Sequence, residues 1–204
     1  MKTNSKYKNV IFDLGGVLVN WKPKETILDV FKNKKIAPID ELIEIWKSGI
    51  CKDLERGLIT QEEAIKKLPE RYSKEDFSYF LKEVYKYLFP LEEGLKIFNA
   101  VKSNGHKIYV LSNFQEEHFA KASPNYDFLK QVDGIVLSFK VKAMKPEPEI
   151  YQALLNNYSL KPEESIFIDD LEENIAGAKT FGIDGIVCKN HDYVLEELRN
   201  KGIV

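Results

Sequence analysis

Six polar residues of the kind used in metal or phosphoryl chemistry stand directly after apolar runs, or in the loop that follows one. They are Asp13, Ser112, Asn113, Lys145, Asp169 and Asp170. The runs are rich in β-branched and aromatic residues and too short for helices, which is typical of strands buried in a parallel sheet. Because parallel strands end at one edge of the sheet, where such folds bind ligands, we expect these side chains to converge.

Three carboxylates and one ammonium in a partly dry site favour a bound cation, because like charges repel strongly away from water. Oxygen-only ligands suit Mg²⁺, which usually binds a few carboxylates together with waters and a phosphate. A carboxylate such as Asp13 can attack phosphorus and form an aspartyl-phosphate. The hydroxyl of Ser112, backbone amides and the ammonium of Lys145 can neutralise the phosphoryl oxygens. The pattern therefore predicts phosphoryl transfer with Mg²⁺ as cofactor.

Each of these motifs also has a structural explanation. Ser112-Asn113 could cap a helix, and Asp169-Asp170 could form a turn stabilised by its own side chains. Asp13 could likewise begin a turn, and Lys145 could be a solvated loop charge. Their shared placement at one predicted edge favours a functional site over these separate explanations.

Alternating strands and helices must position these residues. After the first strand, which ends at Asp13, we expect strands at Lys107–Ser112, Gly134–Ser138, Ser165–Asp169 and Asp184–Cys188. Helices are expected at Glu92–Asn104, from about Gln115, at Pro148–Tyr158, at Glu173–Phe181 and from about Tyr193 to Lys201. This order predicts an α/β fold, a Rossmann-like doubly wound parallel sheet with helices on both faces.

The segment from Pro23 to Leu88 has a different character, with helical spacing of apolar residues and no convincing strand. Thr60 and Glu63 form a capping-box pattern, and Ser73 begins a weaker version of it. We therefore predict a core domain made of residues 1–20 and 90–204, and a small helical cap domain at residues 21–89. The cap should act as a lid that excludes water and selects the substrate.

Composition excludes several classes of partner. The 204 residues hold 30 Lys and Arg against 32 Asp and Glu, which leaves no basic surface for nucleic acid or an anionic membrane. No signal peptide is visible, and no run reaches the roughly 18 apolar residues that span a membrane. Cys51 and Cys188 match neither a zinc site nor a disulfide framework. We expect a cytoplasmic monomer or homodimer that binds a small phosphorylated metabolite.

The motifs closely resemble those of the haloacid dehalogenase-like hydrolase superfamily over nearly the whole chain. The resemblance rests on four segments, 12–18 (FDLGGVL), 111–113 (LSN), 145–151 (KPEPEIY) and 167–174 (FIDDLEEN). It implies the core fold of that superfamily with a helical cap. Within the capped branch, the segments look most like sugar-phosphate phosphatases of the α-glucose-1-phosphate phosphatase type and the phosphatase domains of epoxide hydrolases.

The resemblance also implies roles for individual residues. Asp13 would be the nucleophile, and Ser112 and Lys145 would bind the transferring phosphoryl group. Substrate binding would further involve Asn113, Gly15 and Gly16. Asp169 and Asp170 would bind Mg²⁺ alongside Asp13 and the main-chain carbonyl of Gly15. Asn174 would be a supporting polar residue.

Gly15 departs from the pattern of the family phosphatases, which commonly carry a second Asp two residues after the nucleophile. That Asp protonates the leaving alcohol and then activates water. Without it, we expect activated esters to be hydrolysed ahead of ordinary alkyl phosphates, unless a cap side chain supplies the proton. Two alternatives stay open: a metal-independent 2-haloacid dehalogenase, and a non-catalytic binding protein on the same fold. The Asp169-Asp170 pair argues against the dehalogenase, because it would repel a haloacid.

Overall fold

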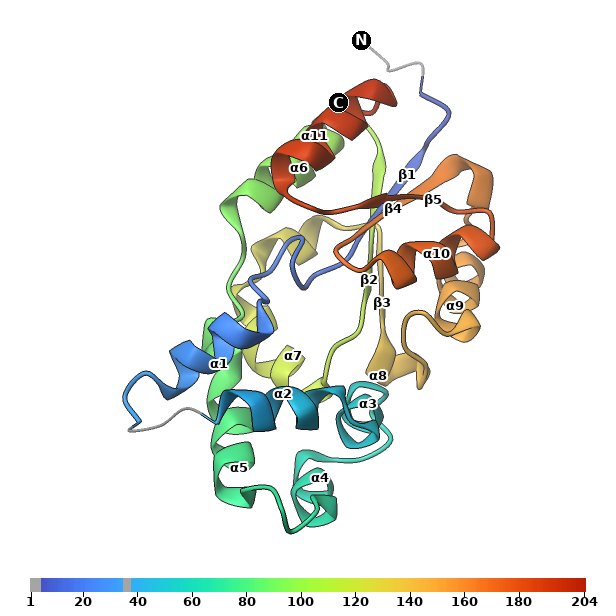
Figure 1. The fold of residues 1–204 in the computed structure, drawn as a ribbon. Helices are drawn as coiled ribbons and strands as arrows, with labels where there is room; N and C mark the ends of the chain where they lie inside the picture. The colour runs from blue at the N-terminus through green and yellow to red at the C-terminus, as the bar shows by residue number, and fades with distance from the viewer. Residues whose placement is uncertain (1–4, 35–37) are drawn as a thin grey trace.

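The structure is a computed structural model that describes residues 5–34 and 38–204 (Figure 1). Five parallel strands form one sheet in the order β3-β2-β1-β4-β5. Their bounds are β1 (Asn9–Phe12), β2 (Lys107–Ser112), β3 (Gly134–Leu137), β4 (Ser165–Asp169) and β5 (Asp184–Val187). The predicted α/β, Rossmann-like parallel sheet is confirmed, with the strand that precedes Asp13 at its centre.

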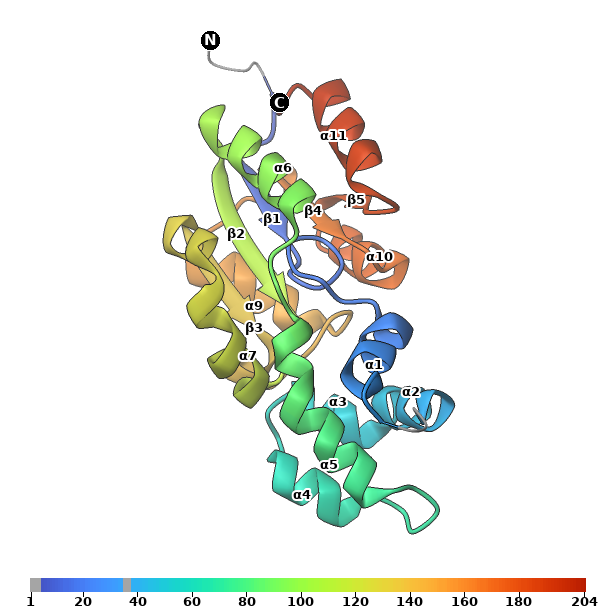
Figure 2. The same cartoon turned by 90° about the vertical axis from the view of Figure 1, so that its left-hand side faces the viewer.

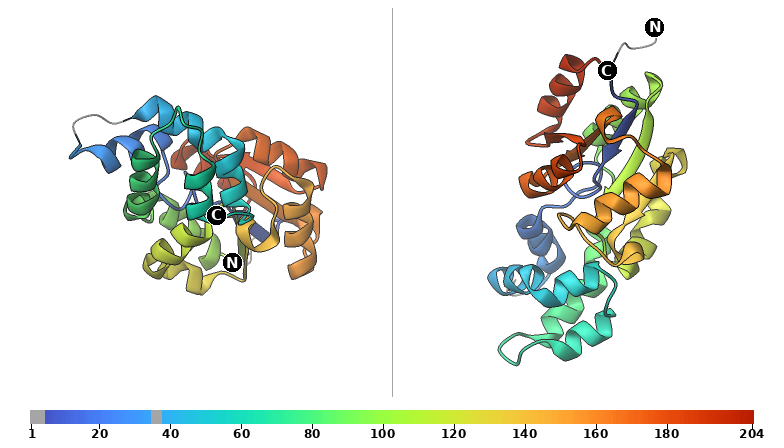
Figure 3. Two further views of the ribbon diagram at one scale, coloured as in Figure 1. Left: turned by 90° about the horizontal axis from the view of Figure 1, so that it is seen from below. Right: turned by 90° about the vertical axis from the view of Figure 1, so that its right-hand side faces the viewer.

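Helices cover both faces of the sheet because its strands are apolar on both sides. Val10 and Phe12 of β1 pack in one hydrophobic cluster with α6 (Glu92–Ser103) and α11 (His191–Asn200). Ile11 points to the opposite face, against α9 (Pro148–Tyr158) and α10 (Glu172–Thr180), which Figure 3 shows in front of the strands in its right-hand view. Burying each such side chain is worth roughly 1.5–3 kcal/mol. The centre of the sheet is therefore firmly held on both sides.

Shorter elements connect these layers. Between β2 and α9 the chain forms α7 (Glu116–Ala122), η2 (Ser123–Asn125), η3 (Asp127–Gln131), β3 and α8 (Ser138–Val141), and η4 (Pro162–Glu164) precedes β4. In the described part of the chain, no helix is both long and apolar enough to cross a membrane. Cys51 and Cys188 are buried and unpaired.

Residues 23–87 form a separate group of helices, called here the helical unit. It comprises α1 (Pro23–Phe31), α2 (Ile39–Lys47), α3 (Gly49–Glu55), α4 (Gln61–Lys67), α5 (Lys74–Glu83) and η1 (Val84–Tyr87). The unit has its own hydrophobic cluster, which includes Phe31 and Phe77. Thr60 and Glu63 form the predicted capping box at the start of α4. The apolar stripe from Phe77 is interrupted, since α5 ends at Glu83 and the chain continues as a 3-10 turn.

Two adjacent segments connect the helical unit to the core. Asn20 donates its backbone N–H to the carbonyl of Phe89 (2.8 Å) and its side-chain amide to that of Tyr87 (3.0 Å). Val19 and Pro90 form an antiparallel bridge beside them. The unit lies beyond the carboxyl ends of β2 and β3, while the C-terminus lies at the far end of the sheet (Figures 1 and 2). The helical unit is therefore held next to the edge where the candidate residues were predicted.

Gly94 in the first turn of α6 gives a test of this packing. A Cβ atom there would overlap the carbonyl oxygen of Val17, in the turn that follows Asp13, and that backbone cannot easily retreat. We expect Gly94→Ala to lower the free energy of unfolding by about 1–3 kcal/mol in urea titrations. Gly49→Ala is the matched control, because nothing lies within 4 Å of its Cβ position. Equal stability of the two variants would contradict this packing argument.

Candidate active site

Asp13 lies immediately beyond β1 and is fixed by the sheet itself. Its backbone N–H donates to the carbonyl of Ile168 (2.9 Å), which extends the ladder between β1 and β4 by one residue. Its carboxylate Oδ1 accepts the backbone N–H of Leu14 (2.7 Å). The Asp13 residue as a whole is 7% exposed. The structure therefore holds a nearly buried carboxylate at the carboxyl edge of the central strand.

Lys145 joins the carboxylates of two neighbouring strands. Its Nζ lies 2.8 Å from Oδ1 of Asp13 and 2.6 Å from Oδ2 of Asp169, and the ammonium stands 5.2 Å from the centre of the Phe167 ring. Lys145 is 2% exposed, which a charged side chain tolerates only when it is paired. Its pKa is raised, because the two carboxylates more than offset the lowering effect of burial. Lys145 is thus a fixed cation and not a solvated loop charge.

The two consecutive aspartates at the end of β4 have different surroundings. Oδ1 of Asp169 accepts hydrogen bonds from the backbone N–H of Leu171 (2.8 Å) and the side-chain amide of Asn174 (2.9 Å). Since its Oδ2 pairs with Lys145, both oxygens of Asp169 are engaged. Asn174 supports the site as expected, and among the described residues its own Oδ1 is buried without a partner. Asp170 is less buried and turns towards Gly16.

The three carboxylates carry more negative charge than Lys145 can balance. Ligand oxygens of Asp13, Asp169 and Asp170 all lie within 4.8 Å of one another. Burial raises the pKa of Asp13 to about 7; the Lys145 ammonium opposes this rise, and the other two carboxylates add to it. Burial and the charge of Asp169 raise the pKa of Asp170 to about 6. A divalent cation would relieve this repulsion, so the donor set fits a hard metal ion.

Ser112 and Asn113 end β2 next to Asp13, but their side chains have different surroundings. Ser112 is buried at the last position of the strand. Asn113 accepts the backbone N–H of Lys145 with Oδ1 (2.8 Å) and donates its amide to the Lys145 carbonyl (3.0 Å). Both functional groups of its side chain are therefore used to hold Lys145. Although the sequence suggested Asn113 as a substrate-binding residue, its side chain is placed to position the lysine.

Gly15 and Gly16 differ in what a side chain would meet. Gly16 has a φ of +70°, and a Cβ atom there would lie 2.7 Å from Oδ2 of Asp170. Gly15 does not have a positive φ, and its Cβ would make a close contact of 3.4 Å with Trp21. Gly16 is therefore required by both conformation and space, whereas the backbone at Gly15 would accept a larger residue.

The helical unit touches the core beside Lys145. Arg56 donates from Nε to Glu147 (3.0 Å) and from Nη2 to the same carboxylate, which also accepts the backbone N–H of Met144 (2.9 Å). Lys142 donates to the carbonyl of Gly57 (2.6 Å). The end of α3 thus rests on the loop that carries Lys145. No sequence signal indicated the pairing of Arg56 with Glu147, because the two residues are 91 positions apart and of types common at protein surfaces.

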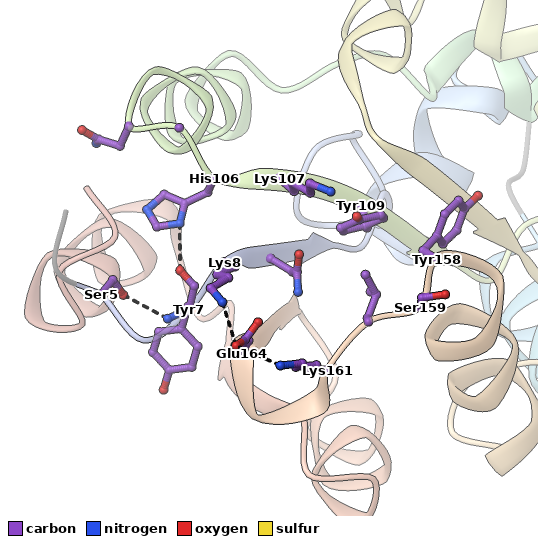
Figure 4. A pocket seen from close by; sticks show the side chains of 14 residues that line it. Ser5, Tyr7, Lys8, His106, Lys107, Tyr109, Tyr158, Ser159, Lys161 and Glu164 are labelled. Atoms are coloured by element: carbon purple, nitrogen blue, oxygen red, sulfur yellow. Dashed lines mark hydrogen bonds and ion pairs between the residues drawn. The ribbon is translucent and has the colours of Figure 1, made fainter. Parts of the chain in front are cut away.

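A separate hollow of about 570 Å³ lies at the opposite edge of the sheet (Figure 4). Lys8 and Lys107, near the starts of β1 and β2, line it, and Glu164 pairs with Lys8 and Lys161 there. None of the predicted site residues reaches this hollow. The candidate chemistry is therefore confined to the carboxyl edge.

Sequence comparisons place this architecture in a known family. Residues 7–182 match the family model described as haloacid dehalogenase-like hydrolase. The chain is 25% identical over 195 residues to D-ribitol-5-phosphate phosphatase of Bacteroides thetaiotaomicron, covering 90% of this chain and 92% of the relative. It is 26% identical over 195 residues to a sesquiterpene phosphatase of Aspergillus oryzae, covering 95% of each. Another curated relative, 28% identical, is longer, and the chain spans 36% of its length.

Solved structures agree with the sequence comparisons. A haloacid dehalogenase family enzyme from Bacteroides thetaiotaomicron, in complex with magnesium and inorganic phosphate, has a TM-score of 0.70 and 27% sequence identity. The match covers 89% of this chain and 93% of that one. The residues that match the family model, 7–182, include β1, which leads to Asp13, and the strands that end at Ser112 and Asp169. The chain therefore belongs to the haloacid dehalogenase-like hydrolase family.

Proposed function

We propose that this hydrolase is a Mg²⁺-dependent phosphatase that acts on a small phosphorylated metabolite, most simply a sugar or polyol phosphate. The bridge from Asp13 through Lys145 to Asp169 carries the proposal, because it places a nucleophile and a phosphate-binding cation in one buried site. The relatives named as phosphatases support the reaction class. The unpaired Cys51 and Cys188 suit a reducing compartment such as the cytoplasm.

Asp13 and Asp170 are the side chains that would hold Mg²⁺ directly, together with the Gly15 carbonyl. Asp169 would serve mainly to orient Lys145, because both of its oxygens already have partners. When bound, the ion supplies positive charge that offsets the carboxylates and polarises the phosphoryl group. Asn174 in turn fixes Asp169.

The chain's own residues account for the attack. Leu14 and Lys145 both bind Oδ1 of Asp13, which leaves Oδ2 to approach phosphorus. Lys145 is positioned by its two carboxylate partners and by Asn113, and can bind a phosphoryl oxygen without moving far. Ser112 offers a hydroxyl at the end of the adjacent strand. The resulting aspartyl-phosphate would then be hydrolysed by water.

Residues 21–89 serve, in this proposal, as a lid domain on a core of residues 1–20 and 90–204. The paired segments at Asn20 and Phe89 would act as its hinge, and contacts of α3 with the Lys145 loop would hold it closed. Closure excludes water and strengthens the electrostatic interactions within the site. Substrate preference should therefore depend largely on this unit.

Asp13→Asn tests the nucleophile. An amide is a poor nucleophile towards phosphorus, so hydrolysis of p-nitrophenyl phosphate with Mg²⁺ should fall by about 10³-fold or more. Asp127→Asn is the control, because its carboxylate is exposed and pairs with the similarly exposed Lys130. EDTA should abolish parental turnover. Near-parental activity of Asp13→Asn, or turnover of 2-haloacids that resists EDTA, would exclude the proposed function.

Gly16→Ala tests the position of Asp170. The positive φ should cost about 1–2 kcal/mol of unfolding free energy, and the methyl group should displace the Asp170 carboxylate. We expect weaker Mg²⁺ binding by isothermal titration calorimetry. Gly15→Ala is the control, because it keeps the main-chain carbonyl and has no positive φ. Equal Mg²⁺ affinity in the two variants would argue against Asp170 as a ligand.

Arg56→Met tests the closed arrangement. Losing the hydrogen bonds to Glu147 should increase amide exchange in residues 49–57, measured by mass spectrometry. We expect kcat/KM to fall by roughly 10-fold to 100-fold, since the Lys145 loop would be less well positioned. Arg71→Met removes a comparable but exposed pair with Glu44 and should change neither quantity. Unchanged exchange in Arg56→Met would refute the closing role of this contact.

A further inference from the structure

We propose that Glu55, the last residue of α3, is the general acid and base of the reaction and replaces the carboxylate that is missing at Gly15. Glu55 belongs to the helical unit, so the proton would come from the lid and not from the loop after the nucleophile. This inference rests on the proposed phosphatase function. It identifies a further catalytic residue for that reaction.

The backbone of Glu55 is anchored at the edge of the sheet where the site lies. Its carbonyl accepts a hydrogen bond from Oγ of Ser138, the residue that directly follows β3. The same Oγ accepts the backbone N–H of Phe114 (2.9 Å), which follows the Ser112-Asn113 motif of β2. Ser138 therefore ties Glu55 to the ends of two strands. The neighbouring Arg56 adds the contact with Glu147, two residues beyond Lys145.

Two tryptophans connect the Glu55 side chain with the space above Gly15. Trp46 lies close enough to the Glu55 carboxylate to lower its pKa. Trp46 packs edge-on against Trp21, with ring centres 5.4 Å apart, and Trp21 is the residue that a Cβ at Gly15 would touch. The aromatic pair thus links the surroundings of Glu55 with the space next to Gly15. The charge of Lys145 also reaches this carboxylate and lowers its pKa.

The protonation of Glu55 suits both halves of the reaction. Burial raises its pKa to about 7, although Trp46, Lys145, Arg56 and Lys52 all act to lower it. The buried thiol of Cys51 also lies within electrostatic range of Glu55. A carboxyl group with a pKa near neutrality can donate a proton and later accept one at the same pH. Glu55 also remains partly accessible, as a residue that meets substrate must be.

The proton transfers balance over one turnover. As Asp13 forms its bond to phosphorus, the bond from phosphorus to the leaving oxygen breaks, and the Glu55 carboxyl proton moves to that oxygen. The Glu55 carboxylate then takes a proton from water as the water oxygen attacks phosphorus, and the bond to Asp13 breaks. Asp13 and protonated Glu55 are regenerated, and the net change is hydrolysis of one ester to an alcohol and phosphate.

A proton donor at Glu55 changes which phosphate esters we expect to be substrates, although position 15 is a glycine. If only Lys145, solvent and metal helped the leaving group, poor leaving groups would react far more slowly than activated ones. A proton from Glu55 makes the rate depend weakly on the leaving group, because general acid catalysis contributes roughly 10² to 10⁴ in rate where it is needed. Ordinary alcohol phosphates would then be substrates in the parent protein.

The experiment measures kcat/KM for p-nitrophenyl phosphate, phenyl phosphate and an alkyl phosphate in Mg²⁺-loaded protein. In Glu55→Gln we expect a loss of roughly 10² to 10⁴ for the alkyl ester, a smaller loss for phenyl phosphate and a minor one for p-nitrophenyl phosphate. Glu62→Gln, an exposed carboxylate of α4 that pairs with Lys66, is the matched control and should leave all three unchanged. Adding Gly15→Asp to Glu55→Gln should restore part of the alkyl activity, since the backbone there accepts a side chain.

An equal loss for all three esters in Glu55→Gln would assign Glu55 to packing or binding and overturn the proposal, as would no loss at all. A parent that already shows the steep dependence on leaving group would overturn it as well. A parent that hydrolyses none of the esters would instead refute the phosphatase function itself, and this inference with it. The aryl pair separates catalysis from recognition of substrate hydroxyls, because the two esters share their ring and differ mainly in leaving-group acidity.

Discussion

The repulsion among three carboxylates gathered at one edge of a sheet is the constraint on which the rest of this site depends. Ligand oxygens of Asp13, Asp169 and Asp170 lie within 4.8 Å of one another, and among the described residues Lys145 is the cation that pairs with this group. The surrounding residues make this arrangement tolerable: Asn113 fixes the lysine backbone, and Asn174 fixes Asp169. A divalent cation would complete the balance, and this electrostatic need is the physical basis of the proposed metal site.

Sheet register explains why these side chains meet. Phe12 pairs with Val110 on one side and with Ile168 on the other, so Asp13 emerges level with the last residues of β2 and β4. The sequence could predict this convergence, because buried strands followed by polar residues have few arrangements other than a parallel sheet with one polar edge. The central place of β1 could not be predicted from periodicity alone. The structure shows it, with β1 between β2 and β4.

The features that escaped prediction depend on contacts between distant segments. α3 is seven residues long, too short for periodicity to show which of its faces meets the core, so Glu55 was an ordinary helix carboxylate in the sequence. Asn113 was predicted to bind substrate, and in the structure its side chain hydrogen-bonds the backbone of Lys145, a contact that the sequence could not indicate. Local sequence predicts the position of a polar side chain in the fold more readily than its hydrogen-bond partner.

A proton donor on the helical unit would couple chemistry to closure. When the acid lies two residues after the nucleophile, it is present whether the lid is open or closed. When it lies on α3, the site is complete only while Arg56 and Ser138 hold that helix against the Lys145 side of the sheet. An ester that prevents closure would then meet a nucleophile without an acid and would react slowly. Selection of the substrate and protonation of its leaving group would thus depend on one interface. The glycine at position 15 would then mean that the proton donor lies on the helical unit, and not that the reaction has no proton donor.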